Sequence, residues 1–278
     1  MQTKKFAIVM DCDGTLAHDT TELLVRRILG DSAKFWSGVN EMVRQGWDRP
    51  LAWATKLIRD AKQQETPITR STLEDAAKHV EFFSGALDLE MRLKDFIRHL
   101  GNGQNAEVDV SIQVVTSGFE DLLTVSKLKD NVTEIWGSLL EIDPDTGIAL
   151  GPKSAVSFTE KTRFVFAINK GIPKPDLRSV PERVNDLVPR TSRPVPFENM
   201  IYVGDGLTDI PCYSLIEQHG GAAVGIRGVE IEKPDNEPRL WNYRPRWGPF
   251  RPDYTDGSDL TKLLKDLLHD AIRRSRPG

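Results

Sequence analysis

Two acidic side chains follow a short apolar run near the start of the chain. Residues 6–10 read Phe-Ala-Ile-Val-Met, and Asp11 and Asp13 come directly after them, one residue apart. An apolar run of this length predicts a buried strand. Ionised carboxylates at its end are costly to desolvate without a partner. A hard divalent cation, which prefers oxygen ligands, is a suitable partner for both.

The next two residues suit a turn beside a ligand. Gly14 lets the chain turn sharply after the acids. The Thr15 hydroxyl can donate a hydrogen bond to a phosphate oxygen or brace the turn. The segment therefore places a candidate nucleophile, a second acid and a metal site within a few residues.

Three further groups of polar residues occupy comparable positions, after an apolar run or at the start of a helix near one. They are Thr116 and Ser117 after residues 110–115, Lys161 at the opening of a helix over 163–169, and Asp205 and Asp209 after 200–203. In open α/β sheets, ligands bind outside the carboxyl ends of the strands. We therefore expect these groups to form a single site with Asp11 and Asp13.

The elements that would position this site form an α/β pattern. Strand-like runs recur at 6–10, 110–115, 200–203 and 222–226, with helical patterns between most of them. Such alternation favours a mainly parallel sheet covered by helices. A hairpin over 138–150, turning at Asp143–Gly147, a helix over 86–100 ending at Gly101 and a final helix over 258–274 complete the expectation.

The stretch from about Thr20 to Phe83 is helical throughout, with apolar residues three or four apart. Ser71-Thr72-Leu73-Glu74 is a candidate capping box within it. About sixty residues of helix exceed an ordinary crossover and predict a cap over the carboxyl end of the sheet. We expect a core of residues 1–17 and 85–278 and a helical cap of residues 18–84.

Composition limits the function classes. The 278 residues carry 37 Lys and Arg against 41 Asp and Glu, a net charge of −4, which argues against generic nucleic-acid binding. In the irregular stretch 228–257, cations and aromatics alternate over 239–254, as in a nucleic-acid surface. We expect instead a long loop that packs its aromatics on the core and extends its arginines to water. Cys12 and Cys212 are expected to be reduced packing residues. No signal peptide or membrane span is found, which favours a cytoplasmic protein. A monomer or homodimer is expected.

The segments with chemistry resemble, in order and spacing, the four motifs of the haloacid dehalogenase-like hydrolase superfamily. They are Asp11–Thr15 (Asp-Cys-Asp-Gly-Thr), Thr116, Lys161 and Gly204–Asp209 (Gly-Asp-Gly-Leu-Thr-Asp). With a helical cap between the first two motifs, the chain is similar to the phosphoserine phosphatase-like branch. The resemblance implies a Rossmann-like three-layer core with a C1-type cap. It also implies a Mg²⁺-dependent phosphatase that hydrolyses a small phosphorylated metabolite.

The resemblance implies a role for each residue. Asp11 would attack phosphorus and form an aspartyl-phosphate, and Asp13 would act as acid and then base. Thr116 and Lys161 would bind the phosphoryl oxygens. The implied Mg²⁺ ligands are Asp11, the Asp13 main-chain carbonyl, Asp205 and Asp209, the last through water unless it braces Lys161. Thr15, Ser117, Gly118 and Glu22 are expected to complete the phosphate and substrate contacts.

Several alternatives stay open at this point. Thr116 could cap a helix beginning near Phe119, Ser117 could do the same, and Lys153, Lys170 and Lys174 are rivals of Lys161. Phosphoserine phosphatases usually have a glutamate nine positions after the nucleophile, where this chain has Thr20 and Glu22 follows two positions later, so the resemblance does not decide whether phosphoserine is the substrate. Phosphotransfer or mutase chemistry through the same intermediate, and a non-catalytic phospholigand-binding protein, are the competing functions. Asp13 argues against a dehalogenase.

Overall fold

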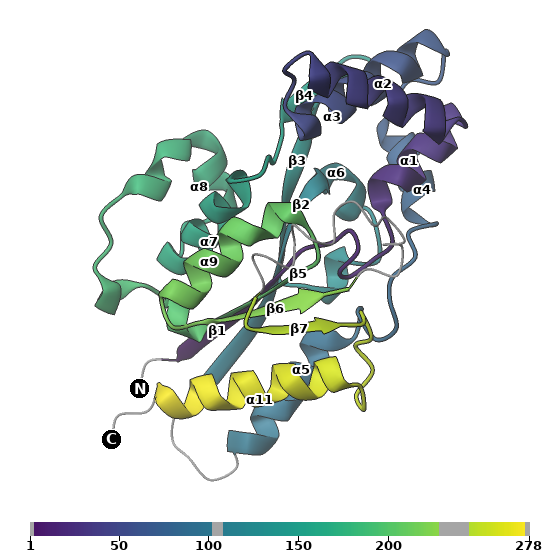
Figure 1. Cartoon of the computed structure of the whole chain (residues 1–278). Helices are drawn as coiled ribbons and strands as arrows, with labels where there is room; N and C mark the ends of the chain where they lie inside the picture. The colour runs from purple at the N-terminus through teal and green to yellow at the C-terminus, as the bar shows by residue number, and fades with distance from the viewer. Residues whose placement is uncertain (1–2, 102–107, 228–244, 276–278) are drawn as a thin grey trace.

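A seven-stranded sheet forms the centre of the protein (Figure 1). The structure, a computed structural model, describes residues 3–101, 108–227 and 245–275. The strand order is β4-β3-β2-β1-β5-β6-β7, and every neighbouring pair is parallel except β3 and β4. The strands are β1 (Lys4–Met10), β2 (Val108–Phe119), β3 (Glu134–Ile142), β4 (Ala149–Ser154), β5 (Met200–Gly204), β6 (Ala222–Ile226) and β7 (Trp247–Phe250). The predicted mainly parallel α/β fold is confirmed.

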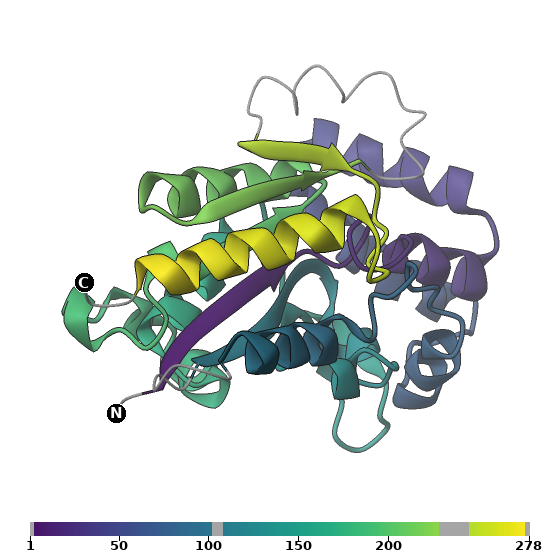
Figure 2. The same ribbon diagram turned by 90° about the horizontal axis from the view of Figure 1, so that it is seen from below.

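The alternation of side chains along β1 produces the three layers. Phe6, Ile8 and Met10 belong to one hydrophobic cluster, and Ala7 and Val9 belong to another on the opposite face. Figures 1 and 2 show the helices that cover these faces. They are α5 (Leu89–Gly101) and α11 (Asp259–Arg274) on the first, and α7 (Glu160–Lys170), α8 (Lys174–Ser179) and α9 (Ile210–Gln218) on the second.

The helical insertion is confirmed as four helices, although the last one ends at Ala77 and Phe82 forms a β-bridge with Ala17. They are α1 (Thr20–Leu29), α2 (Ser32–Arg44), α3 (Arg49–Gln63) and α4 (Arg70–Ala77). Each of the first three follows an aspartate whose side chain accepts a hydrogen bond from a main-chain N–H of the first turn. This bond satisfies an N–H that has no partner within the helix. The capping box predicted at 71–74 is wrong. The Thr69 hydroxyl accepts from the Thr72 N–H, and the Thr72 hydroxyl accepts from the Thr69 N–H. The Thr72 hydroxyl therefore takes the place of the Glu or Gln side chain that is usual in a capping box.

The insertion shares its hydrophobic cluster with the edge of the sheet. Besides residues of α1–α4, the cluster contains Phe119, Leu122, Leu140 and Ala149 from β2, α6 (Glu120–Leu123), β3 and β4. The ring of Trp53 meets that of Phe119 edge to face at 4.8 Å between centroids. We keep the name cap for α1–α4. The division of the chain at residues 17/18 and 84/85 stays a prediction.

Two elements differ from the sequence expectation. The strand predicted over 110–115 extends to Phe119 in β2. The pairing of β2 with β3 shifts register between Val115 and Phe119. In the stretch expected to be irregular, residues 247–250 form the edge strand β7. Residues 228–244 lie outside the described part of the chain. Short 3₁₀ turns occur at Lys129–Asn131, Pro181–Asn185, Arg190–Ser192, Phe197–Asn199 and Leu207–Asp209.

The remaining expectations concern the connections. The hairpin turn is confirmed, since the Gly147 N–H donates to the Asp143 carbonyl at 2.9 Å. The final helix is also confirmed and is capped by Ser258. Trp247, Phe250 and Tyr254 pack on the core, as expected for the aromatic part of 239–254 that is described. None of the described helices is both long enough and apolar enough to cross a membrane.

Candidate active site

The first two acids lie side by side because β1 and β5 are neighbours. Met10 pairs with Val203 across the two strands, and the Asp11 N–H continues the ladder by donating to the Val203 carbonyl at 2.9 Å. Asp11 directly follows β1 and Asp205 directly follows β5. From β1 the sheet extends through β2 on one side and β5 on the other, so the strand order reverses there. This is the position where open α/β sheets bind ligands.

Lys161 lies between two of the acids. It is fully buried in the first turn of α7, and its Nζ is 2.9 Å from Asp11 Oδ1 and 2.7 Å from Asp209 Oδ1. Burial alone would lower the pKa of this amine, but the charges of the two carboxylates outweigh it and raise the pKa. Lys161 is therefore a permanently charged group against Asp11.

The rival lysines are engaged elsewhere. Lys170 donates to the Val184 and Asp186 carbonyls, and Lys174 pairs with Glu120 and Glu134 at 2.9 Å each. Lys153 is exposed on β4. Among the described lysines, Lys161 is the one that pairs with Asp11.

Asp209 uses both carboxylate oxygens within the protein. Oδ1 accepts from Lys161 and, at 2.8 Å, from the Tyr202 hydroxyl, while Oδ2 accepts from the Gly206 N–H at 2.8 Å. A Cβ on Gly204 would lie 2.5 Å from Asp209 Cγ, so glycine is needed there. Asp209 was expected either to hold the metal through water or to hold Lys161. The structure shows the contact with Lys161.

Asp205 is covered by the turn after β1. Gly14 has φ +75°, and a Cβ there would lie 2.1 Å from Asp205 Oδ2. The Thr15 hydroxyl donates to Asp205 Oδ1 at 3.3 Å. A side chain at position 14 would therefore displace Asp205 in addition to straining the turn. Thr15 braces the turn through this contact.

The donor set fits a hard divalent cation. One oxygen each of Asp11, Asp205 and Asp209 lies within 4.8 Å of the others. Burial, followed by the neighbouring carboxylates, raises the pKa of Asp11 to about 7 and that of Asp205 well above its ordinary range. A bound cation would offset the cost of ionising these carboxyl groups and favour their charged forms. Divalent cations such as Mg²⁺ prefer oxygen ligands of this kind.

Asp13 lies in a different environment. Its Oδ1 accepts from the Thr20 N–H at 2.9 Å, and the Thr20 hydroxyl bonds the same carboxyl group. Burial, and then the charge of Asp19, raises the pKa of Asp13 to about 8. At neutral pH this carboxyl group is mostly protonated, which is the state a general acid needs.

Three oxygens converge on the space left free by Gly118. A Cβ there would lie 3.2 Å from Asp13 Oδ2, 3.3 Å from Thr116 Oγ1 and 3.4 Å from Thr20 Oγ1. Thr116 is buried, and its hydroxyl oxygen accepts from the Gly118 N–H at 2.9 Å. The helix-cap alternative for Thr116 is wrong, because α6 begins at Glu120 without a side-chain cap.

Two predicted site residues are not joined to this cluster by a described contact. Glu22 accepts from Trp36 Nε1 at 2.6 Å and from Arg26 Nε at 2.5 Å, within the cap. The Ser117 hydroxyl is buried with no hydrogen-bond partner among the described residues, while its carbonyl accepts from Ser138. Their substrate contacts stay predictions.

Sequence reasoning missed Tyr202 and Thr20. A tyrosine inside a buried strand needs a partner for its hydroxyl, so Tyr202 carried a usable signal. Thr20 carried none, because its contact with Asp13 depends on how the cap begins. Cys12 and Cys212 are free and buried, as expected.

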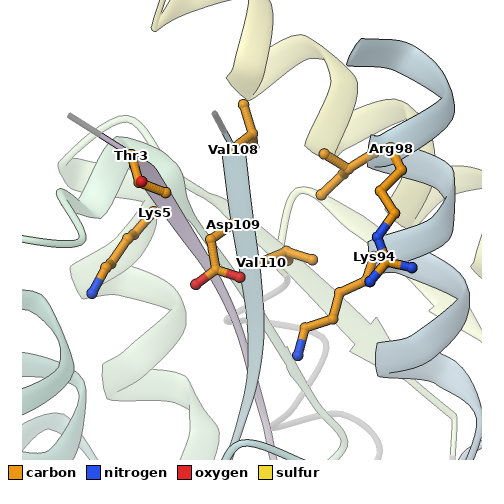
Figure 3. Close-up of a pocket in the computed structure, with 8 residues that line it drawn as sticks. Thr3, Lys5, Lys94, Arg98, Val108, Asp109 and Val110 are labelled. Atoms are coloured by element: carbon orange, nitrogen blue, oxygen red, sulfur yellow. The ribbon is translucent and has the colours of Figure 1, made fainter. Parts of the chain in front are cut away.

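A cavity of about 420 Å³ lies at the other end of the sheet (Figure 3). It is lined by Thr3, Lys5, Lys94, Ile97, Arg98, Val108, Asp109 and Val110. These residues include the first residues of β2, whereas the acidic cluster follows the last residues of β1 and β5. The cavity is therefore separate from the candidate active site.

Known proteins share this architecture. The chain aligns over 95% of its length with 99% of a phospho-aspartyl intermediate analogue of phosphoserine phosphatase, with a TM-score of 0.54 and 16% identity. It also aligns over 88% of its length with 70% of a HAD family hydrolase of Salmonella enterica serovar Typhi, with a TM-score of 0.53 and 14% identity. The chain has the haloacid dehalogenase-like fold.

Another solved structure has a similar fold. Cytosolic 5′-nucleotidase IIIB bound to cytidine has a TM-score of 0.50 and 13% identity, over 98% of this chain and 87% of that one. In sequence, the chain is 25% identical to an uncharacterized protein of Borreliella burgdorferi, over 94% of this chain and 96% of that protein. No protein-family profile matches the chain.

Proposed function

We propose that the protein is a Mg²⁺-dependent phosphatase that hydrolyses a small phosphomonoester through an aspartyl-phosphate on Asp11. The observation that carries the proposal is the contrast between buried Asp11 and half-buried Asp13. Asp11 contacts the charged amine of Lys161, and Asp13 has only Thr20 as a described hydrogen-bond partner. The shared fold with phosphatases supports the assignment. A cytoplasmic location belongs to the same proposal.

Asp11 is suited to act as nucleophile. Its Oδ1 accepts from the Cys12 N–H at 2.7 Å and is 2.9 Å from Lys161 Nζ, which together fix the carboxylate. Positive charge on Lys161 favours the ionised form that attacks phosphorus. Attack forms the Asp11–phosphorus bond and breaks the bond to the leaving alcohol, and water then hydrolyses the aspartyl-phosphate.

Asp13 is suited to move the proton. With a pKa raised to about 8 by burial, it holds a proton at neutral pH and can donate it to the leaving oxygen. The resulting carboxylate can then take a proton from the attacking water. Thr116, whose hydroxyl faces the space beside Gly118, and Lys161, which contacts Asp11, would bind phosphoryl oxygens.

Asp11, Asp205 and the Asp13 main-chain carbonyl would hold Mg²⁺. The ion would neutralise charge on the phosphoryl group and keep Asp11 ionised. The neighbouring Asp209 carboxylate, whose oxygens bond Lys161 and Gly206, would support the lysine.

The decisive variant is Asp11→Asn, assayed with 4-nitrophenyl phosphate and Mg²⁺. We expect loss of turnover by at least about 10³-fold with an unchanged circular dichroism spectrum. Asp121→Asn is the matched control, because Asp121 is a partly buried aspartate that accepts from the Leu140 N–H outside the site. EDTA should abolish wild-type activity and Mg²⁺ restore it.

Intact-mass measurement after rapid acid quench tests the intermediate directly. Wild type should gain the mass of one phosphoryl group and Asp11→Asn should not. Product analysis with added alcohols and sugars distinguishes hydrolysis from transfer. Retained turnover in Asp11→Asn would reject Asp11 as the nucleophile. Phospholigand binding without turnover in wild type would support a non-catalytic binding protein.

A further inference from the structure

Tyr254 reaches the loop after β1 from the opposite end of the chain. It follows β7, and its side chain is fully buried. The hydroxyl donates to the Thr15 carbonyl at 2.8 Å, across 239 positions of sequence. Leaving either buried polar group without a partner would be costly. The hydrogen bond therefore ties the C-terminal segment to the loop that carries the catalytic aspartates.

The backbone of Tyr254 is held independently of this hydroxyl. Its N–H donates to the Ser84 carbonyl at 2.8 Å, and its carbonyl accepts from the Arg92 guanidinium. Arg92 also donates to the Gly85 carbonyl. Gly85, at φ +75°, approaches so closely that a Cβ there would lie 2.5 Å from the Tyr254 carbonyl oxygen. The ring thus presents a fixed donor to Thr15.

Thr15 carries the connection on to a candidate metal ligand. Its hydroxyl donates to Asp205 Oδ1, and the adjacent Gly14 backbone passes directly against Asp205 Oδ2. The Thr15 N–H donates to the Cys12 carbonyl at 3.1 Å, which closes the turn. In a turn this tight, displacement of the Thr15 carbonyl also displaces the groups that contact Asp205.

We propose that Tyr254 is a positioning residue for the divalent-cation site. It fixes the Thr15 carbonyl, and the loop after β1 then holds the Asp205 carboxylate beside Asp11. The inference rests on the proposed function, since it takes Asp11 and Asp205 as metal ligands. Hydrogen-bond partners behind metal ligands commonly control affinity by orienting them. Tyr254 acts on the ligand Asp205 indirectly, through its hydrogen bond to Thr15.

Tyr254→Phe tests this because it keeps the ring and all main-chain contacts and removes only the hydroxyl. Mg²⁺ binding to the full chain is measured by isothermal titration calorimetry at neutral pH. We expect the Kd for Mg²⁺ to rise about three- to tenfold, with kcat at saturating Mg²⁺ within about twofold of wild type. Thr15→Val, which removes the hydroxyl that contacts Asp205, should weaken Mg²⁺ binding in the same direction.

Ile272→Val is the matched control for general loosening of the core. Ile272 lies on α11 in the same hydrophobic cluster as Tyr254 and belongs to no part of the site. This control should lower the melting temperature and leave the Kd for Mg²⁺ unchanged. A purely structural tyrosine would behave in the same way.

Each outcome decides the proposal. An unchanged Kd in Tyr254→Phe, with a lowered melting temperature, would overturn the positioning role and leave the proposed phosphatase intact. If Tyr254→Phe does not fold, unchanged Mg²⁺ binding in Thr15→Val overturns it instead. Absence of Mg²⁺ binding by wild type would overturn both this inference and the metal assignment.

Discussion

Lys161→Met is the substitution for which the structure gives the clearest quantitative expectation. Methionine has a similar length but removes the charge that lies 2.9 Å from Asp11 and 2.7 Å from Asp209. Removing one partner of a buried ion pair leaves an uncompensated charge and typically costs about 3–5 kcal/mol. The metal-free protein should therefore lose roughly that much free energy of unfolding, a fall in melting temperature of roughly 6–20 °C.

The loss should also depend on pH. Burial raises the pKa of Asp11 to about 7 from its ordinary 3.8, so the folded protein retains a proton that the unfolded chain releases. This contribution to stability is complete below about pH 4 and is lost as the pH rises through about 7. Lys161 opposes the rise in the pKa of Asp11. Without it, the stability difference between variant and wild type should be larger at about pH 8 than at about pH 6.

Urea unfolding in EDTA at both pH values measures these quantities. Arg70→Met is the control, because Arg70 forms an exposed pair with Glu74 and its loss should not change stability measurably. A loss below about 1 kcal/mol for Lys161→Met, or an equal loss at both pH values, would contradict the reasoning. Either result would mean that the carboxylates are compensated without the lysine.

Two further variants test the space around Asp13. Gly118→Ala places a methyl group 3.2 Å from Asp13 Oδ2 and 3.3 Å from Thr116 Oγ1, so kcat/KM should fall at least about tenfold. Wild-type kcat/KM in this variant would show that the space is not used by substrate. Thr20→Val removes the hydroxyl bonded to Asp13 and should slow hydrolysis of an alkyl phosphate more than that of 4-nitrophenyl phosphate, whose leaving group needs no proton. Equal slowing of both substrates would assign Thr20 a purely structural role, and Thr21→Val is the neighbouring control.

The proximity of the acids and the lysine of the candidate site could be predicted because their positions follow from the elements that carry them. Asp11 and Asp205 each end a buried parallel strand, and such ends meet at one edge of a sheet. Lys161 could be selected because its helix begins where an amine can reach that edge. These inferences need only local patterns and one rule of topology.

Contacts between distant segments could not be predicted in the same way. The bond from Tyr254 to Thr15 depends on the path of the chain after β7, and no local pattern encodes it. Strand β7 was missed because Trp-Gly-Pro-Phe is a poor strand sequence. It forms because β6 offers a free edge, and an edge strand tolerates proline.

The cap and the β3–β4 hairpin are joined more firmly than the sequence suggests. The Ala149 N–H donates to the Ile68 carbonyl at 2.8 Å, Thr69 pairs with Ile148, and Leu140 and Ala149 lie in the cap's own hydrophobic cluster. Lifting the cap from the hairpin would expose these apolar groups and break main-chain bonds. A cap that closes over Asp11 would therefore carry the hairpin with it. The body that moves would then include β4 and the outer half of β3. The two crossings into the cap would have to move together, because Ala17 pairs with Phe82 and the Phe83 N–H donates to the Leu16 carbonyl at 3.0 Å.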